Sequence, residues 1–390
     1  MSWQALLLAA VHETPGVARA SAARRLGMSS GLATETTARL VSAGLLAERP
    51  LPSAGQRGRP TTALHPHPRG PVVAAAAITH ETWRVAAVQL GGMTLTSTVR
   101  PHRGDEREVL LAVGSELGIL RRRFGPRIQA IAVAVPGTVV GSTLVHAPNL
   151  GWHDVDLSVL WPCYDGGQGS TGRGFIAGND ATMAAVAEAR RGAAAGAGAA
   201  LHLYLDAGVG GAMLNAGRAV LGAHGTAGEF GHMPFGDPGL RCACGAMGCW
   251  NTGLNGYAVA RLLGDPPPED EVGYLRGVLS AGRAGQPGAL GALGQVAGSL
   301  GRGTAGLVNA LDPHVVTIGG LGRELLEVAG EAAGQAYLAG LMSFRTPAPP
   351  LIPARLGDEA PILGAAEEAF SLALSDEGLK NWMTRDPEEG

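Results

Sequence analysis

The sequence has few aromatic residues, few cysteines and a single lysine. Aromatic side chains make up 4% of the 390 residues, four residues are cysteines, and Lys380 is the only lysine. Three of the cysteines have the spacing of metal ligands, which favours a reducing cytoplasm over a secreted, disulfide-stapled protein. No basic leader precedes Leu6, Leu7 and Leu8, and no clean apolar run reaches membrane-spanning length. We therefore expect a cytoplasmic protein that has no membrane partner.

Glycine and arginine are plentiful, and the charge is unevenly distributed. The 61 glycines indicate many turns and close backbone approaches, and the length suggests two or three domains. Residues 1–70 contain eight arginines and three glutamates, a net charge of +5. The whole chain carries −3, so residues 71–390 carry −8. A basic end on an acidic body suggests a head that binds nucleic acid.

The most informative stretch runs from Gly228 to Asn251 and contains three cysteines and a histidine. His232, Cys242, Cys244 and Cys249 supply one imidazole and three thiolates, a complete tetrahedral set for a structural Zn²⁺ site. Interleaved glycines allow a short loop to wrap around an ion. The alternative is a set of buried or redox-active cysteines beside a solvated histidine. The spacing favours zinc.

The same stretch resembles the signature of the ROK family of sugar kinases and transcriptional repressors. That signature is G-E-x-G-H, a spacer, and then C-x-C-G-x-x-G-C-x-E; only Asn251 departs from it. The resemblance implies an α/β chain with a winged helix-turn-helix followed by a two-lobed, actin-like (ribonuclease H-like) domain. We place the DNA-binding domain at residues 1–66, the sugar-binding domain at 71–378, and a polar, disordered tail at 379–390.

The pattern of the first 66 residues predicts three helices followed by a wing. Apolar periodicity predicts helices at 4–13, 19–26 and 30–43, the last burying Leu32, Leu40 and Val41. Two short helices joined by a glycine-containing turn are typical of a helix-turn-helix, whose next helix reads the major groove. The predicted DNA contacts are Ser29, Ser30, Thr34 and Thr37 from the third helix, with Arg39 as a further candidate, and Arg57 and Arg59 from the wing. The alternative is a helical hairpin that binds protein.

A meander of strands at 72–78, 83–90 and 93–99 opens the second domain. In ROK kinases the first turn carries D-x-G-x-T, which holds ATP phosphates. Here residues 74–82 lack the aspartate and the glycine, and Glu81 would face a phosphate. Glycine turns at 206–211 and 319–322 resemble later nucleotide elements, although ordinary strand-to-helix turns use glycine too. We therefore expect no kinase activity.

The resemblance also implies a set of sugar-binding residues. These are Asn149 in a P-N-L-x-W segment, Asn179 and Asp180 in an N-D-A motif, Glu229, His232 and Asn251. Asp180 occupies the position of the base that activates the attacking hydroxyl in kinases, and at a helix N-terminus we expect it to be ionised. Asn149 could instead be a turn residue, and Asn179 and Asp180 could simply cap a helix.

The sequence therefore predicts a sugar-responsive transcriptional regulator, most simply a repressor, that binds operator DNA as a homodimer or homotetramer. The second hypothesis is an ATP-dependent sugar kinase that retains a DNA-binding domain. The third is a sugar-binding protein whose head docks another protein. Which sugar, which operator, and whether the ligand releases or promotes DNA binding stay open.

Overall fold

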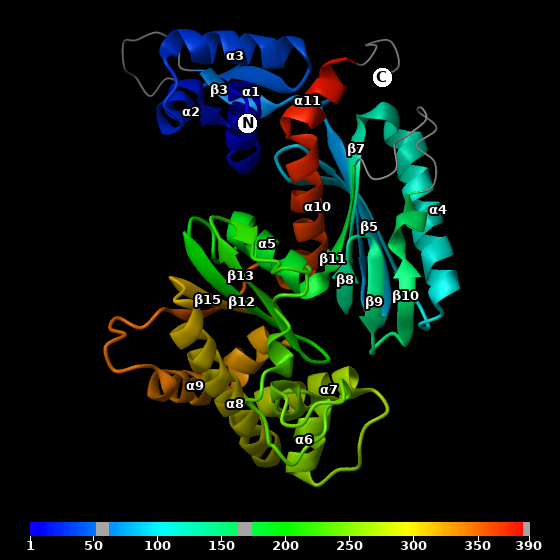
Figure 1. Cartoon of the computed structure of the whole chain (residues 1–390), viewed down its shortest axis with the longest axis vertical. Helices are drawn as coiled ribbons and strands as arrows, with labels where there is room; N and C mark the ends of the chain where they lie inside the picture. The colour runs from blue at the N-terminus through cyan, green and yellow to red at the C-terminus, as the bar shows by residue number, and fades with distance from the viewer. Residues whose placement is uncertain (52–61, 162–173, 385–390) are drawn as a thin grey trace.

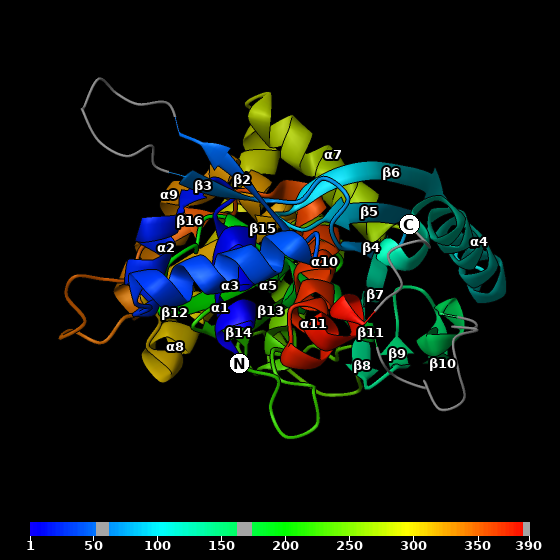
Figure 2. The ribbon, with the colours of Figure 1, turned by 90° about the horizontal axis from the view of Figure 1, so that it is seen from above.

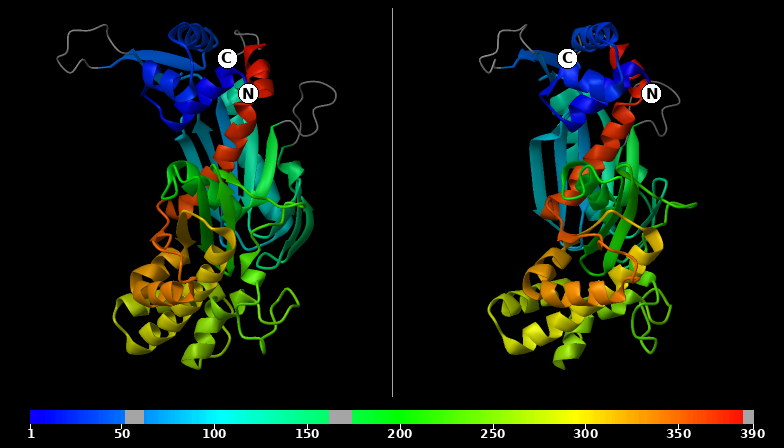
Figure 3. Two further views of the ribbon diagram at one scale, coloured as in Figure 1. Left: turned by 60° about the vertical axis from the view of Figure 1, so that its left-hand side comes forward. Right: turned by 90° about the vertical axis from the view of Figure 1, so that its left-hand side faces the viewer.

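The head and the two lobes of the body follow one another along the long axis of the molecule (Figure 1). We describe them from a computed structural model, which covers residues 1–51, 62–161 and 174–384. In the described part of the chain, no helix is long and apolar enough to cross a membrane. The N-terminus and the last described residues of the chain lie at the head end of the molecule (Figures 1 and 3).

The head is a winged helix-turn-helix. Its elements are α1 (Trp3–Glu13), β1 (Val17–Ala18), α2 (Arg19–Leu26), α3 (Ser30–Ser42), β2 (Leu46–Pro50) and β3 (Thr62–Pro66). The hydroxyl of Ser29 caps α3 by accepting from the amide of Leu32, and Gly27 ends α2 with a φ of 70°. Strands β2 and β3 pair antiparallel as a hairpin. Arg57 and Arg59, the predicted wing contacts, lie outside the described residues.

Lobe 1 is a five-stranded sheet with the order β11-β7-β4-β5-β6. Its elements are β4 (Val72–Ile78), β5 (Thr82–Gln89), β6 (Met93–Pro101), α4 (Glu106–Phe124), β7 (Ile128–Val135) and β11 (Phe175–Asn179). A small sheet of β8 (Thr138–Val140), β9 (Thr143–Ala147) and β10 (Trp152–Asp156) extends it. Strand β4 is buried along its whole length, as its continuous apolar sequence predicts.

Lobe 2 is a second five-stranded sheet, with the order β14-β13-β12-β15-β16. Its strands are β12 (Ala199–Leu205), β13 (Val209–Asn215), β14 (Arg218–Ala219), β15 (Val315–Gly320) and β16 (Leu351–Pro353). Its helices are α6 (Gly256–Leu263), α7 (Glu271–Arg283), α8 (Pro287–Leu311) and α9 (Leu321–Gly340). One apolar cluster joins these helices to β12 and β15, so lobe 2 has a core of its own.

Two helices join the lobes. Helix α5 (Asp180–Arg191) packs on the lobe 2 strands, and α10 (Ala360–Ala373) packs on the lobe 1 strands β4 and β7. The two helices also pack on each other, and the backbones meet at Gly364, where a Cβ would collide with the carbonyl oxygen of Met183. Only glycine permits so close an approach. A relative movement of the lobes would therefore have to move these two packed helices.

The head is fixed to lobe 1 by a continuous core and a buried ionic junction. One apolar cluster runs from Leu8 in the head to Phe370 in α10. At its edge, His12 Nε2 lies 3.0 Å from Glu367 Oε2, and both residues are 3% exposed. The amide of Gly91 donates to His12 Nδ1, and His12 Nε2 lies close both to the carboxylate of Glu367 and, at 2.9 Å, to Nη2 of Arg191. Arg191, at the end of α5, donates to Glu367 and to the carbonyl of His12.

The expected disordered tail from residue 379 is wrong for the residues that the structure describes there. Helix α11 (Asp376–Met383) follows α10 and packs beneath the head (Figure 1). Leu379 is buried, and the indole of Trp382 donates to the carbonyl of Ala43 in the head. Two apolar side chains three residues apart fall on one helix face, which explains why a polar composition still forms a docked helix. Helix α11 therefore braces the head.

Candidate functional site

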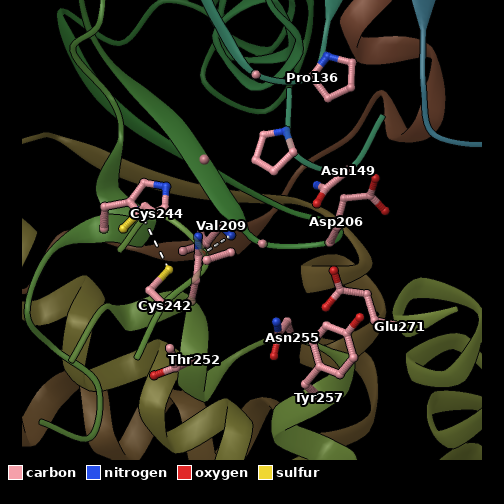
Figure 4. A pocket seen from close by; sticks show the side chains of 18 of the residues that line it. Pro136, Asn149, Asp206, Val209, Cys242, Cys244, Thr252, Asn255, Tyr257 and Glu271 are labelled. Atoms are coloured by element: carbon pink, nitrogen blue, oxygen red, sulfur yellow. Dashed lines mark hydrogen bonds between the residues drawn. The ribbon is translucent and has the colours of Figure 1, made fainter. Parts of the chain in front are cut away.

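A pocket of about 560 Å³ lies between the lobes. Its volume is within the range of roughly 300–1,000 Å³ that is usual for small-molecule sites. Lobe 1 contributes Pro136, Thr138 and Asn149, while lobe 2 contributes two groups of residues on opposite walls. Figure 4 shows Cys242 and Cys244 on one wall and Asp206 and Glu271 on the other. All six residues predicted to bind sugar line this pocket: Asn149, Asn179, Asp180, Glu229, His232 and Asn251.

The four predicted metal ligands converge in the loop that forms one wall. Their ligand atoms, from His232, Cys242, Cys244 and Cys249, all lie within 4.8 Å of one another. Bonds of about 2.3 Å to sulfur and 2.0 Å to nitrogen place tetrahedral ligand atoms roughly 3.5–3.8 Å apart. The Sγ atoms of Cys244 and Cys249 are 3.6 Å apart, and Cys242 Sγ lies 3.7 Å from His232 Nδ1. The cluster therefore has the dimensions of a tetrahedral metal site.

Asp180 begins α5 and lines the pocket, but the expectation that it is fully ionised at neutral pH is wrong. Burial first, and then the negative charges of Asp206 and Glu229, raise its pKa to about 7. The amide of Ala181 donates to Asp180 Oδ1 and opposes the rise without cancelling it. Desolvation thus outweighs the helix N-terminus. At neutral pH this carboxyl group can donate or accept a hydrogen bond.

Four asparagines line the pocket, and the side chains of three of them, Asn179, Asn251 and Asn255, already form hydrogen bonds with backbone groups. The side chain of Asn179 caps α5 by accepting from the amide of Thr182, and it donates to the carbonyl of Gly137. The capping interpretation of Asn179 is therefore confirmed. Asn251 accepts from the amide of Val209 at 2.7 Å, which ties the cysteine-containing loop to the glycine turn after β12. Asn149 is exposed on the pocket wall.

Glu229 connects the two lobes. The hydroxyl of Thr138, on β8 of lobe 1, lies 3.1 Å from Glu229 Oε1. The other carboxylate oxygen lies 3.9 Å from Nε2 of His232, whose Nδ1 faces the thiol cluster. A metal on Nδ1 would therefore leave Nε2 directed toward Glu229, so the metal cluster and the polar pocket wall share one imidazole.

The turn between β4 and β5, where ROK kinases carry their phosphate loop, is filled by charged side chains. The ring nitrogens of His80 lie 3.5 Å from Asp206 Oδ2 and 3.6 Å from Glu81 Oε1. Contact with Asp206 raises the pKa of His80 above 6.5, although burial acts in the opposite direction. Arg276 on α7 pairs with Glu81 at 2.8 Å. Contacts of His80 with Asp206 and of Arg276 with Glu81 thus cross between the lobes at this turn.

The glycine turns have structural explanations. A Cβ on Gly208 would lie 3.0 Å from the side chain of Asn251, and one on Gly210 would lie 2.9 Å from the Cβ of Ala181. A Cβ on Gly320 would collide with the carbonyl of Leu205, and its φ is 57°. Packing alone therefore requires these glycines, whether or not a phosphate binds.

The reading helix exposes most, but not all, of the residues predicted to contact DNA. Ser29, Ser30 and Thr34 are exposed, whereas Thr37 is 1% exposed and packs inside the head. Thr37 therefore cannot reach a base, and that prediction is wrong. Val41 was expected inside and is 37% exposed. The buried face of α3 consists of Ala33, Thr36, Thr37 and Leu40. Because two of these residues are threonines, a prediction from apolar residues alone placed the buried face of the helix incorrectly.

Sequence reasoning missed the acidic wall of the pocket. Asp206 and Glu271 face it from lobe 2, together with Asn255 and Tyr257. Burial first, and then Asp206, raise the pKa of Glu271 to about 7. The carboxylates come from the turn after β12 and from the first residue of α7, 65 residues apart, and nothing in their spacing indicates that they meet.

Comparisons with known proteins bear on this arrangement. The sequence profile of the ROK family matches residues 81–370, about three quarters of the chain. The chain belongs to the ROK family. A glucokinase of Halalkalibacterium halodurans is 34% identical over 205 residues, which cover 49% of this chain and 60% of that relative. A glucokinase of Streptomyces coelicolor is 28% identical over 63% of this chain and 82% of its own length.

Solved structures extend the likeness to the whole chain. A ROK family transcriptional regulator, a homologue of the E. coli MLC protein, matches with a TM-score of 0.77 and 21% identity over 98% of both chains. A ROK hexokinase from Thermus thermophilus matches with a TM-score of 0.61 and 31% identity, covering 77% of this chain and 98% of its own. The fold of this chain, head included, is thus that of the regulator, and its body is that of the kinases.

Proposed function

We propose that the chain is a sugar-responsive, DNA-binding transcriptional regulator that acts as a repressor, with operator DNA and a sugar or sugar derivative as its partners. The proposal rests on one observation: the chain contains both a winged helix and a pocket between the lobes, and a single helix, α5, connects the two. Helix α5 begins at Asp180 in the pocket and ends at Arg191, which bonds to the head. Over 12 residues this helix spans about 18 Å.

We infer that lobe closure is the signal. A sugar that bridges Thr138 of lobe 1 and Glu229 of lobe 2 would replace or reinforce their direct hydrogen bond and so change how the lobes sit. The head is packed on lobe 1, so a shift of lobe 2 reaches it through α5. In a homodimer or homotetramer this would change the separation of two heads on an operator. Such a coupling between two sites is reciprocal.

We infer that the metal is Zn²⁺ with a structural role. Three thiolates and an imidazole suit zinc, and a four-ligand site leaves no open position for catalysis. His232 and the three cysteines would brace the pocket wall that carries Glu229. The DNA contacts in this proposal are Ser29, Ser30, Thr34 and, from the wing, Arg57 and Arg59.

The charge of the pocket favours an uncharged sugar over a sugar phosphate. Asp180, Asp206, Glu229 and Glu271 line it, and a phosphate would meet this negative field. Arg241 and Arg261 also line the pocket, but the guanidinium of Arg261 already donates to the carbonyl of Thr252. Neutral hydroxyl groups, by contrast, can pair with each carboxyl group whether it is ionised or protonated.

The alternative is an ATP-dependent sugar kinase that retains its DNA-binding head. Asp180 favours it, because a carboxyl group with a pKa near 7 can act as a base at neutral pH. The ion pairs of His80 with Asp206 and of Arg276 with Glu81 oppose it, because they occupy the phosphate approach.

Thermal unfolding with a ligand panel separates the two. The panel is D-glucose, N-acetyl-D-glucosamine, N-acetyl-D-mannosamine, their 6-phosphates, and ATP with Mg²⁺. A ligand that binds only the folded chain raises the melting temperature. We expect one free sugar to raise it and ATP to leave it unchanged. A shift with ATP, together with sugar-dependent release of ADP, would instead establish the kinase.

A further inference from the structure

An arginine-rich surface on the body lies next to the DNA-binding head. Helix α4 ends in Arg121-Arg122-Arg123-Phe124, and Arg127 follows it. Arg127 donates to the carbonyls of Pro68 and Gly70, in the segment that leaves the wing hairpin, so this end of α4 touches the head's own linker. Figure 1 shows α4 along the outer side of lobe 1, with its last turn toward the head end of the molecule, and Figure 2 shows it at the edge of the body away from the helices of the head.

The arginines of this surface are not neutralised. Arg69, Arg122 and Arg123 are exposed, and none of them nor Arg127 forms an ion pair with any residue that the structure describes. The ring of Phe124 holds two guanidinium groups in place, with Arg123 at 5.2 Å and Arg127 at 5.8 Å from its centroid. The surface is thus a fixed cluster of positive charge.

The titration of neighbouring groups agrees with a positive potential here. Burial first, and then Arg69 and Arg127, lower the pKa of His67. Burial and the charge of Arg69 also lower the pKa of Arg127. Burial accounts for the larger part of both shifts, and the smaller part that comes from Arg69 and Arg127 reflects the positive charge of this surface.

We propose that Arg69, Arg122 and Arg123, supported by Arg127, form a second contact surface for the DNA backbone, continuous with the winged helix. This inference rests on the proposed function, since it extends the footprint of a DNA-binding head onto the body. Three properties favour DNA: the surface adjoins the winged helix, it is cationic in an otherwise acidic body, and guanidinium groups pair bidentately with phosphates. Such contacts carry no sequence information and position the protein on the duplex.

The surface also offers a mechanism for regulation. The head is packed on lobe 1, which carries the arginine surface, and both contact one duplex only if the head keeps its docked orientation. The junction of His12, Glu367 and Arg191 sets that orientation. A ligand that disturbs this junction through α5 would therefore weaken two sets of DNA contacts at once, those of α3 and those of the arginine surface.

The test is the salt dependence of DNA binding by an Arg122→Gln/Arg123→Gln variant. The matched control is Arg103→Gln/Arg107→Gln, which removes the same charge at the other end of α4, where both arginines are exposed. Arg107 and Arg122 are 15 residues apart in one helix, or about 22 Å. Binding to a 40-base-pair duplex of random sequence is measured by fluorescence anisotropy between 50 and 300 mM KCl, with thermal unfolding as a check on folding.

Each phosphate contact contributes about 0.9 to the slope of log K against log salt. We expect the Arg122/Arg123 variant to flatten that slope by about 1–2 and the control to keep the wild-type slope. An unchanged slope in the variant, or an equal change in the control, would overturn the second surface while leaving the proposed function intact. Absence of wild-type binding at 50 mM KCl would overturn both.

The same proteins are tested on vesicles containing phosphatidylserine, because an anionic membrane could also meet an arginine surface. We expect no binding. Vesicle binding that is lost in the Arg122/Arg123 variant, with an unchanged DNA slope, would show that the surface serves a membrane and would overturn the proposal.

Discussion

Replacing Glu367 by glutamine removes the negative charge at the junction between head and body. The carboxylate is 3% exposed and receives His12 from the head and Arg191 from the end of α5. Glutamine preserves the shape and part of the hydrogen bonding. It removes the negative charge that pairs with the guanidinium group of Arg191, which is only 19% exposed. The expected result is a large loss of stability, because a buried charge that loses its partner is costly.

The magnitude follows from the pKa of Glu367. Burial alone would raise it, but His12 and Arg191 outweigh burial and lower the pKa from 4.5 to about 2. Since one pKa unit is worth about 1.4 kcal/mol, the ionised junction contributes roughly 3 kcal/mol at neutral pH. A lowered carboxyl pKa gives stability that is complete above pH 4.5 and is lost as the pH falls toward 2.

Urea unfolding of the wild type and the variant at pH 7, 4.5 and 3 measures both effects. We expect the free energy of unfolding of the Glu367→Gln variant to be about 3 kcal/mol lower than that of the wild type at pH 7, and we expect this difference to narrow at pH 3. The control is Glu368→Gln on the next residue, which is 29% exposed and pairs with Arg190 at 3.5 Å. That change should cost less than about 1 kcal/mol. A gap at Glu367 no larger than at Glu368, or one independent of pH, would refute the reasoning.

Three further predictions concern the helix pair, the metal and the pocket. Gly364→Ala should lower the free energy of unfolding in urea by about 3 kcal/mol, because the added Cβ collides with Met183. The control Gly294→Ala in α8 places its Cβ in open space and should leave the free energy of unfolding unchanged. Equal effects of the two substitutions would contradict this reasoning. The purified protein should contain one zinc per chain by mass spectrometry, and Cys249→Ser should abolish it and lower the melting temperature; zinc retained in that variant would exclude the site. Sugar affinity should change between pH 6 and 8 in calorimetric titrations and change less in Asp180→Asn, where Glu271 of the same pocket, whose pKa is also raised to about 7, still titrates; an identical profile in both would remove Asp180 from the binding site.

Local patterns predicted the elements and the metal cluster well, because each depends on residues close in sequence. The predicted helix at 19–26 and the strand at 72–78 have those bounds in the structure. His232 and the three cysteines lie within 18 residues, so a single loop must bring them together. The family signature located the pocket for the same reason.

What the sequence could not predict are contacts between distant segments. His12 and Glu367 are 355 residues apart, and neither carries a motif. The ionisation of Asp180 was misjudged because the expectation weighed the helix N-terminus, a local effect, and not Asp206 or the burial supplied by the fold. The docking of α11 was missed because its polar composition hides a short apolar face formed by Leu379 and Trp382.

The most direct test of the central claim is DNA binding with and without the sugar found in the thermal panel. A duplex selected from a random-sequence library is titrated with the protein at 150 mM KCl, with the sugar absent and at saturation. We predict tight binding without sugar and a dissociation constant at least fivefold larger with it, and we predict the same factor for the effect of DNA on sugar affinity. Equal DNA affinity in both conditions, for a sugar that demonstrably binds, would contradict the account.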